Sequence, residues 1–468
     1  MHTPQTLFLA SHGGRIVDDL IADFGDVAAE YDAFDRGLCL ADAADVGLLR
    51  VSGADAATFL HNQFSTNVSA LIPGQGHYST YNSPKGRMLA SLFLWRESPP
   101  PALFSKGVSA EEPAPEVILI GGGRGFVAGE RESSPLPSLS PCPSPAESGR
   151  GEAFPSSLPL AGERRREDWG GDGVSASALS PSPPTPLPQG ERGEKIPAFF
   201  ILLAADLTET VRKRLSMYVL RSKVTIEDVS ATYAFLGLCG ADVSAQAHLL
   251  TLSPRGRECP DKPPSVSDGH PLSKGGKHNV QTQNDITTVA LSSTRLLLIL
   301  PLETLPENWS QLTQNARPAG RHLWRRAAIR DGIPLITAAT ADRLIPQSAN
   351  WDALGGLDFQ KGCYPGQEII ARTRYLGRTK ERLYLAHCDE AAVFDPATPL
   401  YSPAFGEQAC GIVVNAAPDR QGQIMLASFQ TSAADSPIHV ARPDGSVLTL
   451  LPLPYELPVN ETPNRVKL

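Results

Sequence analysis

The distribution of proline is the feature that most limits how this chain of 468 residues folds. Eighteen of its 42 prolines lie within residues 99–197, which include PLPSLSPCPSP at 135–145 and PSPPTPLP at 181–188. A polar, proline-rich stretch cannot bury enough apolar surface to offset the entropy lost on ordering. We therefore predict that residues 99–197 are a long disordered insertion. The polar residues 252–285 are predicted to form a second loop insertion within the core.

The rest of the chain predicts an α+β protein. Without the two insertions about 335 residues remain, a common size for a compact protein of two or three domains. Residues 1–98 and 198–375 alternate strand and helix patterns, and a turn at residues 83–86 joins two predicted strands at 77–82 and 87–95. From residue 376 to 468, short apolar runs separated by turn residues predict a small antiparallel β-barrel.

Composition and cysteine spacing exclude several classes of protein. The net charge is −8, from 42 basic and 50 acidic residues, so we expect no direct contact with nucleic acid. The seven cysteines are scattered and form no CxxC pair, which argues against a disulfide scaffold and a four-cysteine metal site. No apolar run is long enough for a membrane helix, and the first residues do not resemble a secretory signal. We expect a cytoplasmic monomer that does not enter a membrane.

The segment from residue 358 to 382, DFQKGCYPGQEIIARTRYLGRTKER, carries the most chemical information. Cys363 precedes a helix predicted to begin near Gln367, and Lys361 lies two residues before it. A helix N-terminus and a lysine both favour the thiolate form of a cysteine. The alternative is that Cys363 is a small buried residue in a tight turn, since no histidine or aspartate is adjacent to it. Arg372 and Arg374 belong to a basic cluster that either binds carboxylates or phosphates or forms a solvated face.

The same segment resembles a known family. Lys361-Gly362-Cys363-Tyr364-x-Gly366-Gln367-Glu368 matches the K-G-C-Y-x-G-Q-E signature of the YgfZ family of folate-binding, tRNA-modification-related proteins. This family is similar to a mitochondrial iron–sulfur assembly factor and shares a fold with the glycine-cleavage T-protein, an aminomethyltransferase. The runs at residues 49–53, 59–63, 83–87, 331–334 and 345–347 also fit the family. The resemblance covers most of the core and skips both insertions.

The resemblance implies a T-protein-like ring of mixed α/β subdomains around a central folate pocket, followed by a C-terminal antiparallel β-barrel. It implies a tetrahydrofolate-binding accessory factor that supports the maturation or repair of iron–sulfur enzymes, such as a tRNA methylthiotransferase. Cys363 would be the key thiol, as a ligand of a transient iron–sulfur cluster, a redox-active thiol or a nucleophile. Lys361, the second catalytic residue, would stabilise the thiolate or attract the glutamate tail of the folate. The implied folate-binding residues are Gly362, Tyr364, Gly366, Gln367, Glu368, Arg372, Arg374, Lys85 and Arg87.

One departure from the aminomethyltransferase bears on activity. That enzyme has an acidic pair in the hairpin that supplies a catalytic carboxylate, whereas Leu89 and Ala90 stand at the matching positions here. Without the carboxylate, the aminomethyl chemistry lacks a general base at this place. We therefore expect an accessory protein. The alternatives are a folate-dependent one-carbon transferase whose base comes from elsewhere, and a partner-binding scaffold with a vestigial pocket.

Overall fold

The computed structural model describes residues 2–97, 197–241, 243, 278–283, 285–375 and 379–458. All of them fall within one compact unit, formed by residues 1–102 and 193–468. The predicted insertion at residues 99–197 lies outside the described residues except for residue 197. The division of the core from a C-terminal domain at residue 376 stays a prediction, because both parts belong to this one unit.

An eleven-stranded sheet forms the centre of the described residues, with the strand order β13-β3-β9-β12-β11-β10-β5-β6-β7-β4-β8. Strands β7 and β12 are nearly continuous apolar runs, and they are buried along almost their whole length, as expected for strands covered on both faces. The strands are β3 (Leu38–Asp42), β4 (Val46–Ser52), β5 (Gln75–Asn82), β6 (Met88–Arg96), β7 (Ala198–Ala204), β8 (Thr225–Asp228), β9 (Tyr233–Gly240), β10 (His278–Gln283), β11 (Ile286–Ser292), β12 (Arg295–Pro301) and β13 (Arg317–Ala319).

The boundary predicted for the second insertion is wrong at its C-terminal end. Residues 278–283, which we assigned to a polar loop, form β10 and pair with both β11 and β5. Only His278 and Val280 of this strand are buried, so its polar residues face outward and hide the strand pattern in the sequence. Long-range pairing with β5 decides the conformation here, whereas composition alone favours a loop.

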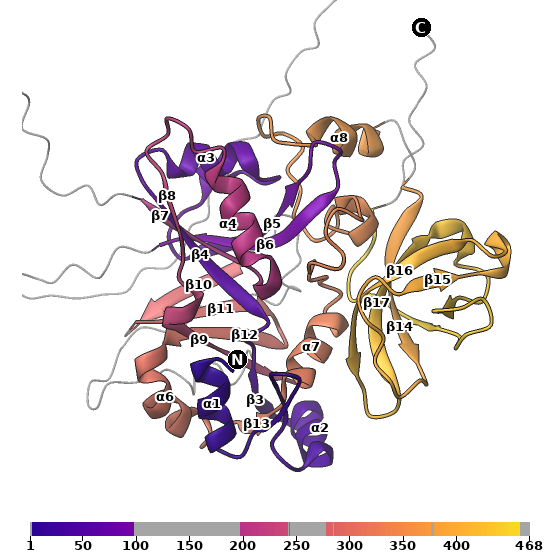
Figure 1. Ribbon diagram of the computed structural model, residues 1–468, viewed down its shortest axis with the longest axis horizontal. Coiled ribbons are helices and arrows are strands. Elements are labelled where there is room, and N and C mark those ends of the chain that lie inside the picture. The colour runs from indigo at the N-terminus through magenta and orange to yellow at the C-terminus, as the bar shows by residue number, and fades with distance from the viewer. Residues whose placement is uncertain are drawn as a thin grey trace, which may run out of the picture. The chain divides into compact units, whose positions relative to one another are not determined.

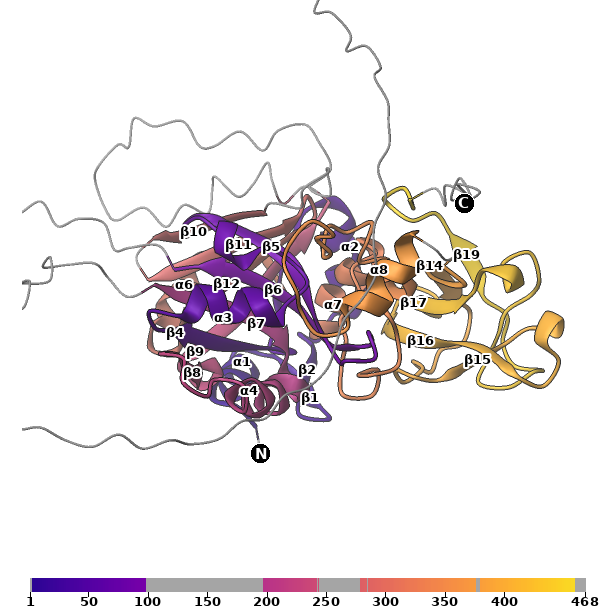
Figure 2. The ribbon, with the colours of Figure 1, turned by 90° about the horizontal axis from the view of Figure 1, so that it is seen from above.

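Helices cover the large sheet and link it to the C-terminal sheet (Figure 1). Helix α7 packs against β9 and β3 of the large sheet and against β16 and β17 of the C-terminal sheet, and Figure 2 shows it between the two. The helices are α1 (Pro4–Ser11), α2 (Val27–Arg36), α3 (Ala56–Gln63), α4 (Thr208–Ser216), α6 (Leu305–Leu312), α7 (Arg321–Arg330) and α8 (Gln367–Tyr375). None of the helices in the described ranges has the length and apolar character needed to cross a membrane.

The C-terminal part forms a six-stranded antiparallel sheet that curls into a half-barrel, in the order β18-β15-β16-β17-β14-β19 (Figure 1). This confirms the antiparallel architecture predicted from the short apolar runs. A separate two-stranded sheet pairs β1 (Arg15–Val17) with β2 (Leu20–Asp23). The C-terminal strands are β14 (Glu381–Cys388), β15 (Pro399–Tyr401), β16 (Ala409–Pro418), β17 (Gln423–Gln430), β18 (His439–Val440) and β19 (Thr449–Leu451).

Candidate functional site

The structure brings the Cys363 segment against the turn of the β5–β6 hairpin, about 280 residues earlier in the chain (Figure 1). Gly86 closes this turn with φ +71°, and Gly366 has φ +79°, a region that favours glycine. A Cβ added to Gly366 would lie 2.5 Å from the carbonyl oxygen of Ser83 and 2.7 Å from Cα of Gly86. The two backbones therefore touch, and only glycine fits between them. Lys85 and Arg87 flank Gly86 in this turn, which contacts Gly366 just before α8; their role in binding folate stays a prediction.

Lys361 is directed away from solvent. Its side chain is buried, and its ammonium group donates to the carbonyl oxygens of His61 and Phe64, the latter at 2.6 Å. The ammonium also lies 4.8 Å from the ring centre of Tyr364. Burial lowers the pKa of Lys361 to about 8. The hydrogen bonds of the ammonium go to the end of α3, while the charges of Asp358 and Cys363 act on it only as smaller effects that raise its pKa.

Cys363 is a free, exposed cysteine. This excludes the alternative in which Cys363 is buried in a tight turn. His61 of α3 approaches the same loop, since a Cβ on Gly362 would lie 3.6 Å from its Nε2. Burial and the neighbouring ammonium of Lys361 lower the pKa of His61. A histidine that is remote in sequence thus stands next to the residue that precedes the thiol.

The other predicted residues lie around this loop in different environments. Tyr364 is buried, and Gln367 donates from Nε2 to the carbonyl oxygen of Lys361 at 3.5 Å. The guanidinium of Arg374 stacks 4.5 Å from the ring centre of Phe359, and Arg87 donates to the carbonyl oxygen of Arg343 at 3.0 Å. The exposed members are Lys85, Arg87, Gly362, Glu368, Arg372 and Arg374.

A cavity of about 630 Å³ lies elsewhere in the molecule. It is lined by parts of β6, β7 and β12, by α7, by the segment after α7 and by residues of β16. Its aromatic lining residues are Tyr78, Phe93, Trp324, Trp351 and Phe394. None of the eleven residues predicted from the sequence lines this cavity. The implied folate-binding residues therefore lie on the thiol loop and its surroundings, apart from the large cavity.

Three residues that line the cavity carry buried polar atoms with no hydrogen-bond partner among the described residues. They are Oδ1 of Asp45, Nη2 of Arg295 and Nε1 of Trp351. Unpaired buried polar atoms cost free energy and are rare in folded proteins, so each one needs an explanation. Two of these groups are held through another atom: Nε of Arg295 donates to Asp331 at 2.5 Å, and Oδ2 of Asp45 accepts from Arg325 at 3.1 Å. The cavity thus combines aromatic walls with an acceptor and two donors.

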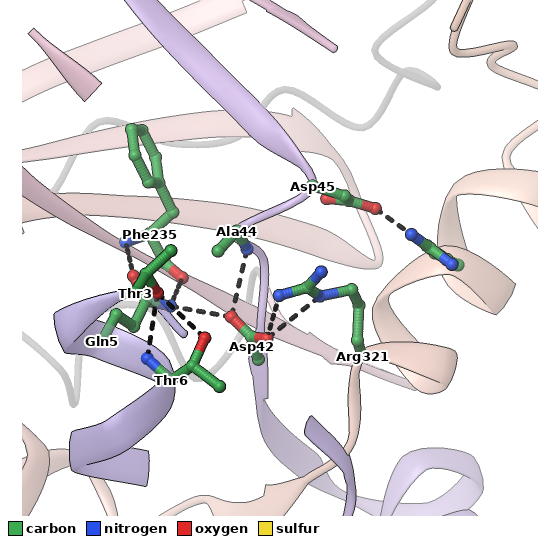
Figure 3. A network of polar contacts seen from close by, with 9 residues as sticks. Thr3, Gln5, Thr6, Asp42, Ala44, Asp45, Phe235 and Arg321 are labelled. Carbon is green, nitrogen blue, oxygen red and sulfur yellow. Dashed lines mark hydrogen bonds and ion pairs between the residues drawn. The ribbon is translucent and has the colours of Figure 1, made fainter. Parts of the chain in front are cut away.

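Figure 3 shows a buried polar network that includes Arg321, one of the residues that line the cavity. Oδ2 of Asp42 accepts a hydrogen bond from Arg321 of α7. Oδ1 of Asp42 accepts from the side chain of Gln5 at 2.8 Å and from the backbone N–H of Ala44 at 3.1 Å. Gln5 in turn exchanges two hydrogen bonds with the backbone of Phe235, both at 2.8 Å. The network fixes the turn from β3 to β4, and so it orients Asp45, which follows three residues after Asp42.

Asp45, Arg295 and Trp351 were not predicted from the sequence, because their spacing carries no signal. They come from a turn, the start of a strand and an irregular segment, and only the fold brings them together. The one available hint was Arg295, a charged residue that opens the apolar run LLLIL. Buried arginines of this kind are usually paired.

Comparisons with known proteins agree with the motif. No family model matches the chain. A curated protein of Yersinia pseudotuberculosis serotype IB (strain PB1/+), named tRNA-modifying protein YgfZ, is 28% identical over 265 residues, covering 54% of this chain and 72% of that protein. A protein of the same name from Yersinia enterocolitica serotype O:8 / biotype 1B is 33% identical over 195 residues, covering 38% of this chain and 56% of its own length.

Among solved structures, the glycine cleavage system aminomethyltransferase T from Bartonella henselae matches with a TM-score of 0.59. The match covers 96% of both chains at 10% sequence identity, so it bears on the fold alone. The predicted α+β class with a T-protein-like arrangement is confirmed. The resemblance to the YgfZ family, which the motif around Cys363 predicted, is confirmed by these relatives, and the chain has the fold of the glycine-cleavage T-protein.

Proposed function

We propose that this protein binds a tetrahydrofolate in the cavity and supports iron–sulfur enzymes through the thiol of Cys363, and thereby supports tRNA modification indirectly. The observation that carries the proposal is the cavity itself, with aromatic walls and three unpaired buried polar atoms. Its volume lies in the range of pockets that hold small organic ligands. The names of the relatives and the T-protein-like fold support the same conclusion.

The residues that line the cavity fit a folate. A pterin is a flat heterocycle with N–H donors and acceptors along one edge, and aromatic side chains such as Trp351 and Tyr78 offer faces for it. Oδ1 of Asp45 can accept from the pterin edge, while Nη2 of Arg295 and Nε1 of Trp351 can donate to it. A bound folate supplies one-carbon chemistry, whereas these side chains bind and orient it. In this proposal the folate binds in the cavity, and not at the residues around Cys363 that the family resemblance implied.

The thiol of Cys363 acts outside the cavity in this proposal. Cys363 is exposed, as are the cations Lys85, Arg372 and Arg374 of the hairpin turn and α8, so a protein partner can reach the thiol. We propose that the partners are iron–sulfur enzymes, including one that methylthiolates tRNA. Cys363 would then be a transient cluster ligand, a redox-active thiol or a nucleophile. Because the net charge is −8, the contribution to tRNA modification is indirect.

Calorimetric titration of the full chain with tetrahydrofolate under reducing conditions tests the binding site. We expect saturable one-site binding, a loss of affinity of about tenfold or more in Asp45→Asn, and wild-type affinity in Cys363→Ala. Asp435→Asn, which changes an exposed carboxylate of the C-terminal part, is the matched control. Absence of wild-type binding at millimolar tetrahydrofolate would refute the proposed ligand.

A complementation experiment tests the thiol. In cells that lack their own copy of such a protein, the wild-type chain should restore methylthiolated tRNA, measured by mass spectrometry of digested tRNA. Cys363→Ala and Cys363→Ser should fail to restore it while the purified variants still bind tetrahydrofolate. Full restoration by Cys363→Ala would remove the thiol from the proposal.

A folate-dependent one-carbon transferase is the second candidate, and Asp45 favours it. The hairpin lacks the acidic pair of the aminomethyltransferase, but Asp45 lines the cavity with one carboxylate oxygen unpaired. That oxygen is a general base at a different place from the hairpin. Formation of methylenetetrahydrofolate from tetrahydrofolate and a thiol-bound aminomethyl donor, with release of ammonia and the free thiol, would establish turnover if Asp45→Asn abolished it. No product above the uncatalysed rate would exclude it.

A further inference from the structure

The sequence motif pairs Lys361 with Cys363, but the structure directs the lysine elsewhere. We propose that Lys361 is a positioning residue, which ties the Cys363 loop to the C-terminal end of α3 and so sets where the thiol is presented. The inference rests on the proposed role of Cys363 as the functional thiol. It differs from the reading in which the lysine charge acts on the thiolate.

The C-terminal end of α3 is the first anchor of the loop. The last carbonyl oxygens of a helix have no partner within the helix, and a cation near them is favourable. Lys361 supplies both a donor and a cation, since its ammonium donates to His61 within the last turn and to Phe64, the residue that follows the helix. An exposed lysine would keep its ammonium in water, whereas only 8% of this residue is accessible.

Other hydrogen bonds fasten the same loop to the same turn. The backbone N–H of Asp358 donates to the carbonyl oxygen of Ser65 at 2.9 Å. The carboxylate of Asp358 then accepts from the backbone N–H of Gln360 at 2.8 Å and of Lys361 at 3.2 Å. The loop is thus anchored to the residues after α3 up to position 361.

The far side of the thiol is anchored as well. Tyr364 is buried under the ammonium of Lys361, and Gly366 contacts the backbone of Ser83 and Gly86 in the hairpin turn. Gly362 and Cys363 are exposed between these two anchors. An exposed thiol between two fixed points has a defined position, and Lys361 is the side chain that makes the first of them.

Two measurements separate positioning from direct action on the thiol. The first is amide hydrogen exchange of residues 362–366, which reports how often the loop opens. The second is the rate of Cys363 alkylation by iodoacetamide as a function of pH, followed on its own peptide by mass spectrometry. Both use the full-length chain, and a lysine charge acting on the thiolate would move the midpoint of the pH–rate profile.

In Lys361→Met, we expect exchange at residues 362–366 to accelerate at least about tenfold, because two charge-assisted hydrogen bonds are lost. The alkylation midpoint should shift by less than about 0.3 pH units. Lys361→Gln retains two N–H donors without the charge and should recover part of the protection. Lys213→Met, which removes an exposed lysine on α4, should leave both measurements unchanged.

An alkaline shift of the midpoint by about one unit in both Lys361→Met and Lys361→Gln, with unchanged exchange, would overturn the proposal. If Lys361→Met does not fold, Lys361→Gln carries the same comparison. Tetrahydrofolate affinity measured on the same variants keeps this test apart from the proposed function. Intact binding with a loosened loop supports positioning, whereas failure of the wild type to bind folate counts against the cavity assignment alone.

Discussion

Gly366→Ala is the substitution that most directly tests the contact between the Cys363 loop and the β5–β6 hairpin. Alanine at φ +79° carries a left-handed strain of about 1–2 kcal/mol. Its Cβ would also lie 2.5 Å from a carbonyl oxygen and 2.7 Å from Cα of Gly86, and both are backbone atoms that cannot rotate away. Moving the two segments apart adds about 1–3 kcal/mol, by analogy with overpacked cores. We expect a total loss of about 2–5 kcal/mol in the free energy of unfolding.

Gly13→Ala is the matched control for this experiment. Gly13, in the left-handed turn that ends α1, has φ +99°, but nothing lies within 4 Å of a Cβ added there, so it should lose about 1–2 kcal/mol from strain alone. Urea unfolding followed by circular dichroism gives both values, and an unchanged m value shows that the comparison is valid. Equal losses in the free energy of unfolding for the two variants would refute the backbone contact at Gly366. The Cys363 loop would then not pack against the hairpin turn.

Two further predictions concern buried charged or titratable groups. Arg382→Ala should lower the free energy of unfolding by about 3–5 kcal/mol in urea melts, because it leaves the buried carboxylate of Asp352 without the guanidinium that binds it at 2.7 and 3.0 Å. Burial lowers the pKa of His278 to about 4, so the unfolded state binds a proton that the folded state does not, and stability should fall as the pH drops from 6.5 toward 4. Between pH 7 and 4.5, His278 should account for a loss of about 2–3 kcal/mol in the free energy of unfolding. The variant His278→Gln should show a smaller loss over this range. An unchanged pH dependence in this variant would contradict the burial of a neutral His278.

Local sequence patterns were sufficient to predict the elements whose contacts are close in the chain. The SPKG turn between two alternating strands predicted the β5–β6 hairpin, and Gly86 supplies the positive φ that the turn needs. Short apolar runs with turn residues between them predicted the C-terminal antiparallel strands. Strand β10 was the opposite case, since its outward polar residues read as a loop and its pairing with β5 lies about 200 residues away.

The residues of the thiol loop could be identified from the sequence, but their contacts could not. Lys361, Cys363 and Gly366 are neighbours in the chain, so a motif of eight residues is enough to identify them. Their roles were not visible in that motif, because the partners that define them, His61, Phe64 and Gly86, come from other parts of the chain.

The amino-acid sequence by itself determined the class of the protein, its family resemblance and the presence of a thiol on a glycine-rich loop, because these depend on residues close together in the chain. The tertiary structure alone decided that the thiol is exposed, that Lys361 is bonded to the end of α3, and that Asp45, Arg295 and Trp351 line one cavity. The physical reason is that burial and hydrogen-bond partners are properties of packed neighbours. The spacing of residues in a chain does not specify which distant segment will supply them.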